Sequence, residues 1–146
     1  MSRTANLRRQ HDTLLEIVLQ LQADIAAEIT VSSSRQIITR LARLTGVLQM
    51  HLAAEDKVLY PAMMASNDKG TSAMARTFSI QMGDLGAAYS EYVERWSDHQ
   101  KILRDAEAFR KQSAKVFAAL GTRIRRENEE LYPLADALTD STPRAA

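Results

Sequence analysis

The amino-acid sequence predicts an all-α protein folded as a four-helix up-down-up-down bundle. Apolar residues recur at helical spacing along four long segments, and no alternating strand pattern is present. Only 5 Gly and 3 Pro interrupt the 146 residues. Short connectors between long helices favour antiparallel neighbours, as in such a bundle. We expect a single domain over residues 1–146, with a core of about 6–138 and a polar, frayed tail at 139–146.

The first two predicted helices span about residues 6–28 and 34–64. The turn and N-cap residues between them lie at residues 30–34, a run rich in Ser and Thr. Pro61 lies inside the second helix pattern, where a proline favours a kink or a stop. The predicted apolar stripes are Leu14, Ile17, Val18, Leu21 and Ile25 on the first helix, and Ile37, Ile38, Leu41, Leu44, Leu48, Leu52 and Leu59 on the second.

The third predicted helix spans about residues 72–96, and the fourth begins after an N-cap expected at Asp105 and runs to about residue 138. Residues 97–104 between them carry the weakest helical pattern. Pro133, like Pro61, lies inside a helix pattern and favours a kink or a stop. The predicted stripes are Phe78, Met82, Leu85, Tyr89 and Val93, then Phe109, Ala114, Phe117, Leu120, Ile124 and Leu131. The methionines Met50, Met63, Met64, Met74 and Met82 are predicted to fill the core.

Composition excludes several classes of function. A net charge of +1 gives no reason to expect a nucleic-acid or membrane partner. The absence of Cys excludes disulfides, thiolate metal sites and thiol catalysis, and it fits a reducing compartment. No apolar run approaches the roughly 20 residues of a membrane span, and the first residues lack the apolar stretch of a secretory signal. We therefore expect a cytoplasmic protein.

An internal repeat connects the two halves of the chain. Residues 51–61 and 123–133 place Glu, Leu, Tyr and Pro at identical spacings. His11 precedes His51 by 40 residues, as Met82 precedes Arg123 by 41, and Gln and Leu also match around these two positions. The chain is therefore predicted to form two helix hairpins related by a pseudo-twofold axis.

The repeat brings together residues suited to a metal. His51 and Glu55 are one helical turn apart and project from one face of the helix. Folding the two hairpins together would bring His11 and Glu127 to the same point in the core, as in other bundle cofactor sites. Two imidazoles and two carboxylates suit ferrous iron, manganese or zinc.

This pattern resembles that of the hemerythrin-like (HHE cation-binding) domains over about residues 6–138. The resemblance depends on a His in the first helix, His-x-x-x-Glu in the second, and a repeat of that plan with Leu-Tyr-Pro after each Glu. It implies a four-helix bundle with a non-haem di-iron centre that binds or responds to oxygen, nitric oxide or peroxide, or handles iron. It also implies that His11, His51, Glu55 and Glu127 are metal ligands.

The second half departs from that family pattern. Met82 and Arg123 occupy the places of two histidines, and neither is a suitable ligand for a hard iron ion. We therefore expect one ion, with iron favoured and zinc or manganese as alternatives. Because a buried carboxylate pair needs a compensating charge, a further hypothesis places the Arg123 guanidinium beside Glu55 or Glu127, where it would replace the second metal.

Two further expectations concern residues near this centre. Tyr60 and Tyr132 each lie five residues after a Glu, a separation that points away from that Glu on an ordinary α-helix. They are therefore expected to serve packing rather than the site. His99 fits no repeat position and is expected at the surface.

The leading functional hypothesis is a small metal-binding protein for sensing, carriage or iron-stress response. No nucleophile–base pair or phosphate loop predicts conventional catalysis. The alternative is a degenerate, metal-free helical bundle that acts as a regulatory or protein-interaction module. A third hypothesis, a di-iron enzyme that consumes oxygen or peroxide, requires two metals and is weakened by Met82 and Arg123.

Overall fold

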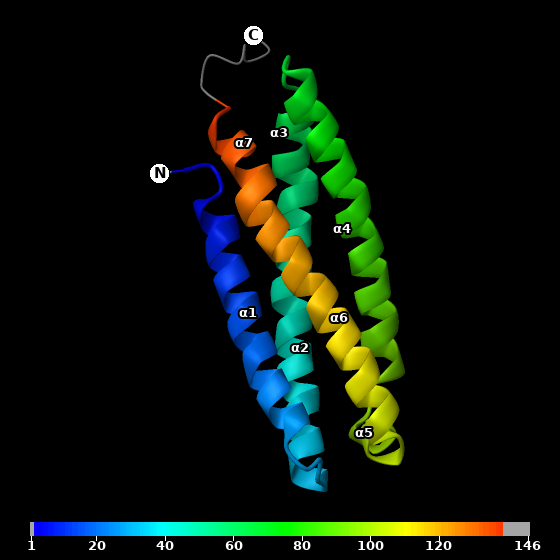
Figure 1. The fold of residues 1–146 in the computed structure, drawn as a ribbon. Helices are drawn as coiled ribbons and strands as arrows, with labels where there is room; N and C mark the ends of the chain where they lie inside the picture. The colour runs from blue at the N-terminus through cyan, green and yellow to red at the C-terminus, as the bar shows by residue number, and fades with distance from the viewer. Residues whose placement is uncertain (1, 139–146) are drawn as a thin grey trace.

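The computed structural model describes residues 2–138, which are all-helical with no strand in that range (Figure 1). The predicted tail at 139–146 lies outside the described residues. The elements are α1 (Ala5–Ala26), α2 (Val31–Ala54), the π-helical turn η1 (Glu55–Leu59), α3 (Tyr60–Met64), α4 (Lys69–Arg95), α5 (His99–Arg104), α6 (Ala106–Arg126), the π-helical turn η2 (Glu127–Leu131) and α7 (Tyr132–Asp136).

Side-chain caps explain where several helices begin. The Thr30 hydroxyl accepts from Ser33 N (3.1 Å) while Ser33 Oγ accepts from Thr30 N (2.8 Å), so α2 begins three residues earlier than predicted. The predicted N-cap Asp105 accepts from the backbone N–H of Ala108 at the start of α6. Asp98 caps α5 in the same way, which gives a short helix to a segment that the sequence pattern left unassigned.

The long helical segments lie lengthwise beside one another in Figure 1, with α1 against α2 and α4 against α6. The two ends of the described chain meet, because Asp136 accepts hydrogen bonds from both Thr4 N (3.1 Å) and Thr4 Oγ1 (2.9 Å). At the other end, Arg110 of α6 donates to the carbonyl of Ile25 at the end of α1 (3.1 Å). No helix of the described chain is long and apolar enough to cross a membrane.

The predicted apolar stripes form most of the core, and Ile38, Leu52 and Val93 are half-buried against it. The prediction for Ala114 is wrong: this residue is exposed and Ser113 is buried, because the Ser113 hydroxyl is paired with the Tyr92 hydroxyl at 2.6 Å. Tyr92, which the predicted stripe did not include, is buried next to Val93. Met50 is 58 % exposed rather than a core filler.

Neither proline stops its helix. In each half the chain widens into a π-helical turn before the proline and continues as a short α-helix after it. The Tyr60 N–H donates to the Glu55 carbonyl, and the Tyr132 N–H donates to the Glu127 carbonyl, which closes each turn over five residues. Each proline follows directly, in the first turn of α3 or α7, where a proline is tolerated. Such turns are rare and are frequent at functional sites.

Candidate metal centre

The structure brings the four predicted residues His11, His51, Glu55 and Glu127 together in the core. One potential ligand atom from each lies within 4.8 Å of all the others. All four side chains are almost completely excluded from solvent, with exposures of 0 to 1 %. They come from α1, the end of α2, the start of η1 and the start of η2.

Hydrogen bonds to amide oxygens orient both imidazoles. His11 Nδ1 lies 2.8 Å from Asn128 Oδ1, and His51 Nδ1 lies 2.8 Å from Gln10 Oε1. An amide oxygen only accepts, so in each ring Nδ1 carries the proton and donates it. The lone pair of each neutral ring is then on Nε2, and the two Nε2 atoms face each other across 3.1 Å at the centre. This orientation leaves Nε2 of each ring available to a metal while the other nitrogen donates a hydrogen bond, as is usual for metal-binding histidines.

The two carboxyl groups complete the centre. Glu127 Oε1 lies 2.9 Å from His11 Nε2, and Glu55 Oε1 lies 3.3 Å from His51 Nε2. Burial raises the pKa of Glu55 well above its ordinary value, and the adjacent Glu127 raises it further. Burial opposes ionisation of Glu127 too, but its polar contacts with Glu55, His11 and His51 hold its pKa below the ordinary value.

The donor set fits a divalent cation on two observations. Glu55 Oε1 is buried and has no hydrogen-bond partner within the described chain, since His51 Nε2 approaches it outside hydrogen-bonding geometry. The two Nε2 lone pairs also point at each other and at carboxylate oxygens. A divalent ion would satisfy all of these atoms and neutralise two ionised carboxylates, which is the compensation that buried charges need.

The expectation that Tyr60 and Tyr132 point away from the carboxylates is wrong. Tyr132 Oη donates to Glu55 Oε2 at 2.9 Å, and Tyr60 Oη donates to Glu127 Oε2 at 3.2 Å. The cause is the π-helical turn, which places the fifth residue after each Glu one full turn above it instead of on another face. Each tyrosine therefore reaches into the centre and bonds the Glu of the opposite half. Burial, then the nearby carboxylates, raise the pKa of both phenols.

The hypothesis that Arg123 neutralises the carboxylates is also wrong. Arg123 is half-buried, donates to Gln81 Oε1, and lies over the Phe78 ring at 5.4 Å from its centroid. In the described structure neither carboxylate of the centre forms an ion pair with it. Gln81 corresponds in the repeat to Gln10, which holds His51, so the same glutamine contact is present in both halves. Gln10 orients the His51 ring toward the centre. Gln81, at the matching position, instead holds the Arg123 guanidinium over Phe78 and out of contact with the carboxylates.

Besides assigning Tyr60 and Tyr132 to packing, sequence reasoning overlooked two residues of the centre, Gln10 and Asn128. A signal existed for Gln10, because it precedes His11 and matches Gln81 in the repeat. Asn128 gave no signal beyond its place after Glu127. His99 lies outside the cluster, half-buried in α5, with its Nδ1 at 3.3 Å from Asp98 Oδ1.

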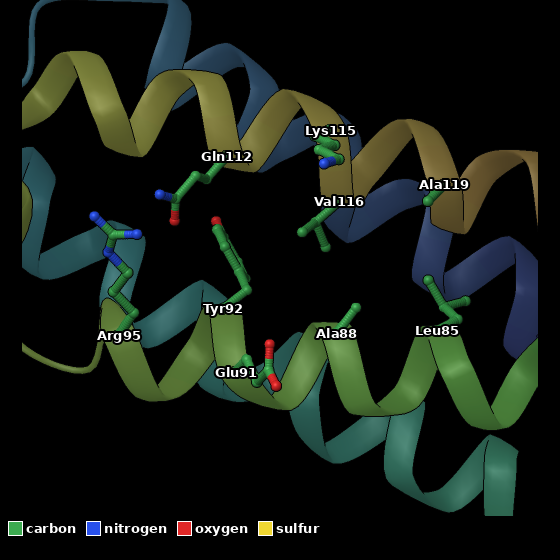
Figure 2. Close-up of a pocket in the computed structure, with 9 residues that line it drawn as sticks. All are labelled: Leu85, Ala88, Glu91, Tyr92, Arg95, Gln112, Lys115, Val116 and Ala119. Carbon is green, nitrogen blue, oxygen red and sulfur yellow. The ribbon is translucent and has the colours of Figure 1, made fainter.

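A surface groove of about 310 Å³ lies between α4 and α6, apart from the centre (Figure 2). Leu85, Val116 and Tyr92 form apolar parts of its lining, and Arg95 and Lys115 add charge. None of the four clustered residues lines this groove. The centre is therefore enclosed in the core, and the groove is a separate feature.

The fold and the site define a class of protein: a helical bundle with a buried His and Glu group able to bind a metal ion. The family model described as the hemerythrin HHE cation binding domain matches residues 2–135, and the chain belongs to that family. Comparison with curated proteins and with solved structures finds no match.

Proposed function

We propose that this protein binds one iron ion through His11, His51, Glu55 and Glu127, and that it serves in sensing, carriage or iron-stress response. The observation that carries this proposal is the convergence of four buried donor atoms around an unpaired carboxylate oxygen. Iron is favoured over zinc or manganese by the family. When bound, iron would supply redox chemistry and affinity for oxygen, nitric oxide or peroxide.

The residues around the centre have distinct roles in this proposal. The amide oxygens of Gln10 and Asn128 hold the imidazoles with Nε2 inward. The hydroxyls of Tyr60 and Tyr132 orient the carboxylates through their outer oxygens. The surrounding core excludes water, which strengthens electrostatic attraction for a cation.

The proposal extends to the architecture. We propose one up-down-up-down four-helix domain whose halves are related by a pseudo-twofold axis, in a cytoplasmic protein. The paired π-helical turns at Glu55 and Glu127 support that relation, as do the matched contacts of Gln10 with His51 and Gln81 with Arg123. The absence of histidine at Met82 and Arg123 supports one ion rather than two.

Metal content tests the proposed function. Protein purified with and without air should contain about one iron per chain by elemental analysis. Ferrous iron added anaerobically to the metal-free protein at 1,000 times its Kd should stabilise it by about 4 kcal/mol, a rise in Tm of roughly 8–16 °C. Two ions per chain would contradict the single site. If neither preparation contains metal and no added ion raises Tm, the metal-free interaction module becomes the better hypothesis.

The amide that holds His11 should matter for metal affinity. Asn128→Ala removes the acceptor for His11 Nδ1–H and leaves all four proposed ligands in place. We expect a roughly 10- to 100-fold loss of iron affinity, because partners of this kind fix the ring and its tautomer. Competition with a chelator measures the change. Glu129→Ala, at an exposed position of the same turn, is the matched control and should leave affinity unchanged.

A further inference from the structure

Tyr132 differs from the other residues around the centre because its hydroxyl oxygen lies close to two proposed ligand atoms. It is 3.1 Å from His11 Nε2 and 3.4 Å from Glu127 Oε1, besides its 2.9 Å hydrogen bond to the outer oxygen Oε2 of Glu55. The side chain is completely buried. We propose that Tyr132 is a fifth ligand, and that its phenolate oxygen binds the ion in the ferric state. This inference rests on the proposed function and names one more residue of the same site.

The spacing of the donor atoms supports this assignment. Metal–ligand bonds of about 2.1 Å hold neighbouring donors roughly 3.0–3.5 Å apart. The separations of the Tyr132 oxygen from His11 Nε2 and Glu127 Oε1, 3.1 Å and 3.4 Å, lie within this range. They also match the separations among the proposed ligands, such as 2.9 Å for His11 with Glu127 and 3.3 Å for His51 with Glu55. The Tyr132 oxygen is therefore at a suitable distance to act as one more ligand of the ion.

Tyr60, the repeat counterpart, is placed differently. Its hydroxyl is 3.2 Å from Glu127 Oε2, the oxygen that faces away from the imidazoles, and it has no hydrogen bond to either ring within the described structure. The difference follows from the unequal halves of the chain. Tyr132 stacks on His11, with ring centroids 5.0 Å apart and planes 12° apart, whereas Met82 takes the place of that histidine in the other half. Tyr60 is accordingly a positioning residue.

Charge favours the ferric state for this ligand set. Two carboxylates and one phenolate carry three negative charges, which one ferric ion neutralises. A phenolate is a hard, anionic oxygen donor and suits a hard cation. The Arg8 guanidinium carbon lies 5.3 Å from the centroid of the Tyr132 ring and adds positive charge beside it. On coordination the O–H bond breaks, the oxygen keeps the electron pair for iron, and the proton is released to solvent.

The test is spectroscopic. Wild-type protein is loaded anaerobically with ferrous iron, oxidised with ferricyanide, and desalted. We expect a visible phenolate-to-iron charge-transfer band, with tyrosinate vibrations in the resonance Raman spectrum. Tyr132→Phe should retain about one iron per chain, lose the band completely, and bind ferric iron at least 10-fold more weakly than Tyr60→Phe. Tyr60→Phe removes the matched hydroxyl and should keep the band.

The outcomes separate this inference from the proposed function. Iron-loaded wild type with no such band would overturn the ligand role of Tyr132 and leave the metal site intact. A band that survives in Tyr132→Phe, or disappears only in Tyr60→Phe, would also overturn it. Wild type that binds no iron would overturn the proposed function, and this inference with it. Circular dichroism shows whether Tyr132→Phe folds. If it does not, the ligand role of Tyr132 is tested by the tyrosinate vibrations of the wild type and of Tyr60→Phe. Their presence in both proteins supports that role, and their absence from the wild type overturns it.

Discussion

His51→Ala is expected to reduce the affinity for iron by at least about 100-fold. Four-ligand structural metal sites have apparent binding free energies of about 10–16 kcal/mol, or roughly 3 kcal/mol for each ligand. A loss of that size corresponds to about two powers of ten in Kd. His51 faces both carboxylates and the other imidazole, with its Nε2 3.1 Å from His11 Nε2, so no neighbouring side chain replaces it. Anaerobic titration against a competing chelator measures the change.

The third histidine of the chain provides the matched control. His99 lies in α5 beside Asp98 and outside the cluster, so His99→Ala should bind iron as wild type does. Circular dichroism of the metal-free proteins separates a lost ligand from a lost fold. Equal iron affinity in His51→Ala and His99→Ala would show that iron, if bound, is held elsewhere.

The helices and most of the core were predictable because apolar residues at helical spacing form a stripe on one face of the helix, and that face packs against the core. Residues such as Leu14, Leu44 and Phe117 lie in the core as their spacing requires. Ser113 was missed because a polar side chain breaks the apolar pattern, and only its partner, Tyr92, on another helix explains its burial. The start of α2 was missed by three residues because Thr30, the first residue of the predicted turn, is the cap.

The clustering of His51 with Glu55 was predictable because it needs only the geometry of an ordinary helical turn. The hydrogen bonds of Tyr60 and Tyr132 to the carboxylates could not be predicted, because they depend on two π-helical turns and the predicted periodicity was the 3.6 residues of an α-helix. In retrospect, a proline directly after each tyrosine was the available signal. The position of Arg123 depends on Gln81 in a different helix, so no spacing within one helix could have indicated it.

Glu55→Met should make the metal-free protein more stable and abolish its response to metal. Glu55 is completely buried, and its Oε1 has no hydrogen-bond partner within the described structure. An unsatisfied buried polar atom costs about 1–3 kcal/mol. Met is similar in volume and flexible enough to fill the space. The substitution removes one acceptor of the Tyr132 hydroxyl, but His11 Nε2, 3.1 Å away, remains as an acceptor.

The expected gain is therefore about 1–2 kcal/mol in the free energy of unfolding, or roughly 2–8 °C in Tm, measured by thermal and denaturant unfolding after chelation. Added ferrous iron should then raise Tm little, because a ligand is missing. Glu55→Gln, which keeps the shape and polarity, should stay near wild type without metal and also lose iron affinity. A Glu55→Met protein less stable than chelated wild type would mean that Glu55 is already well satisfied without a cation. A stabilised variant that no longer responds to iron would instead show that the unpaired oxygen of Glu55 destabilises the metal-free protein. Residues needed for function often reduce stability in this way.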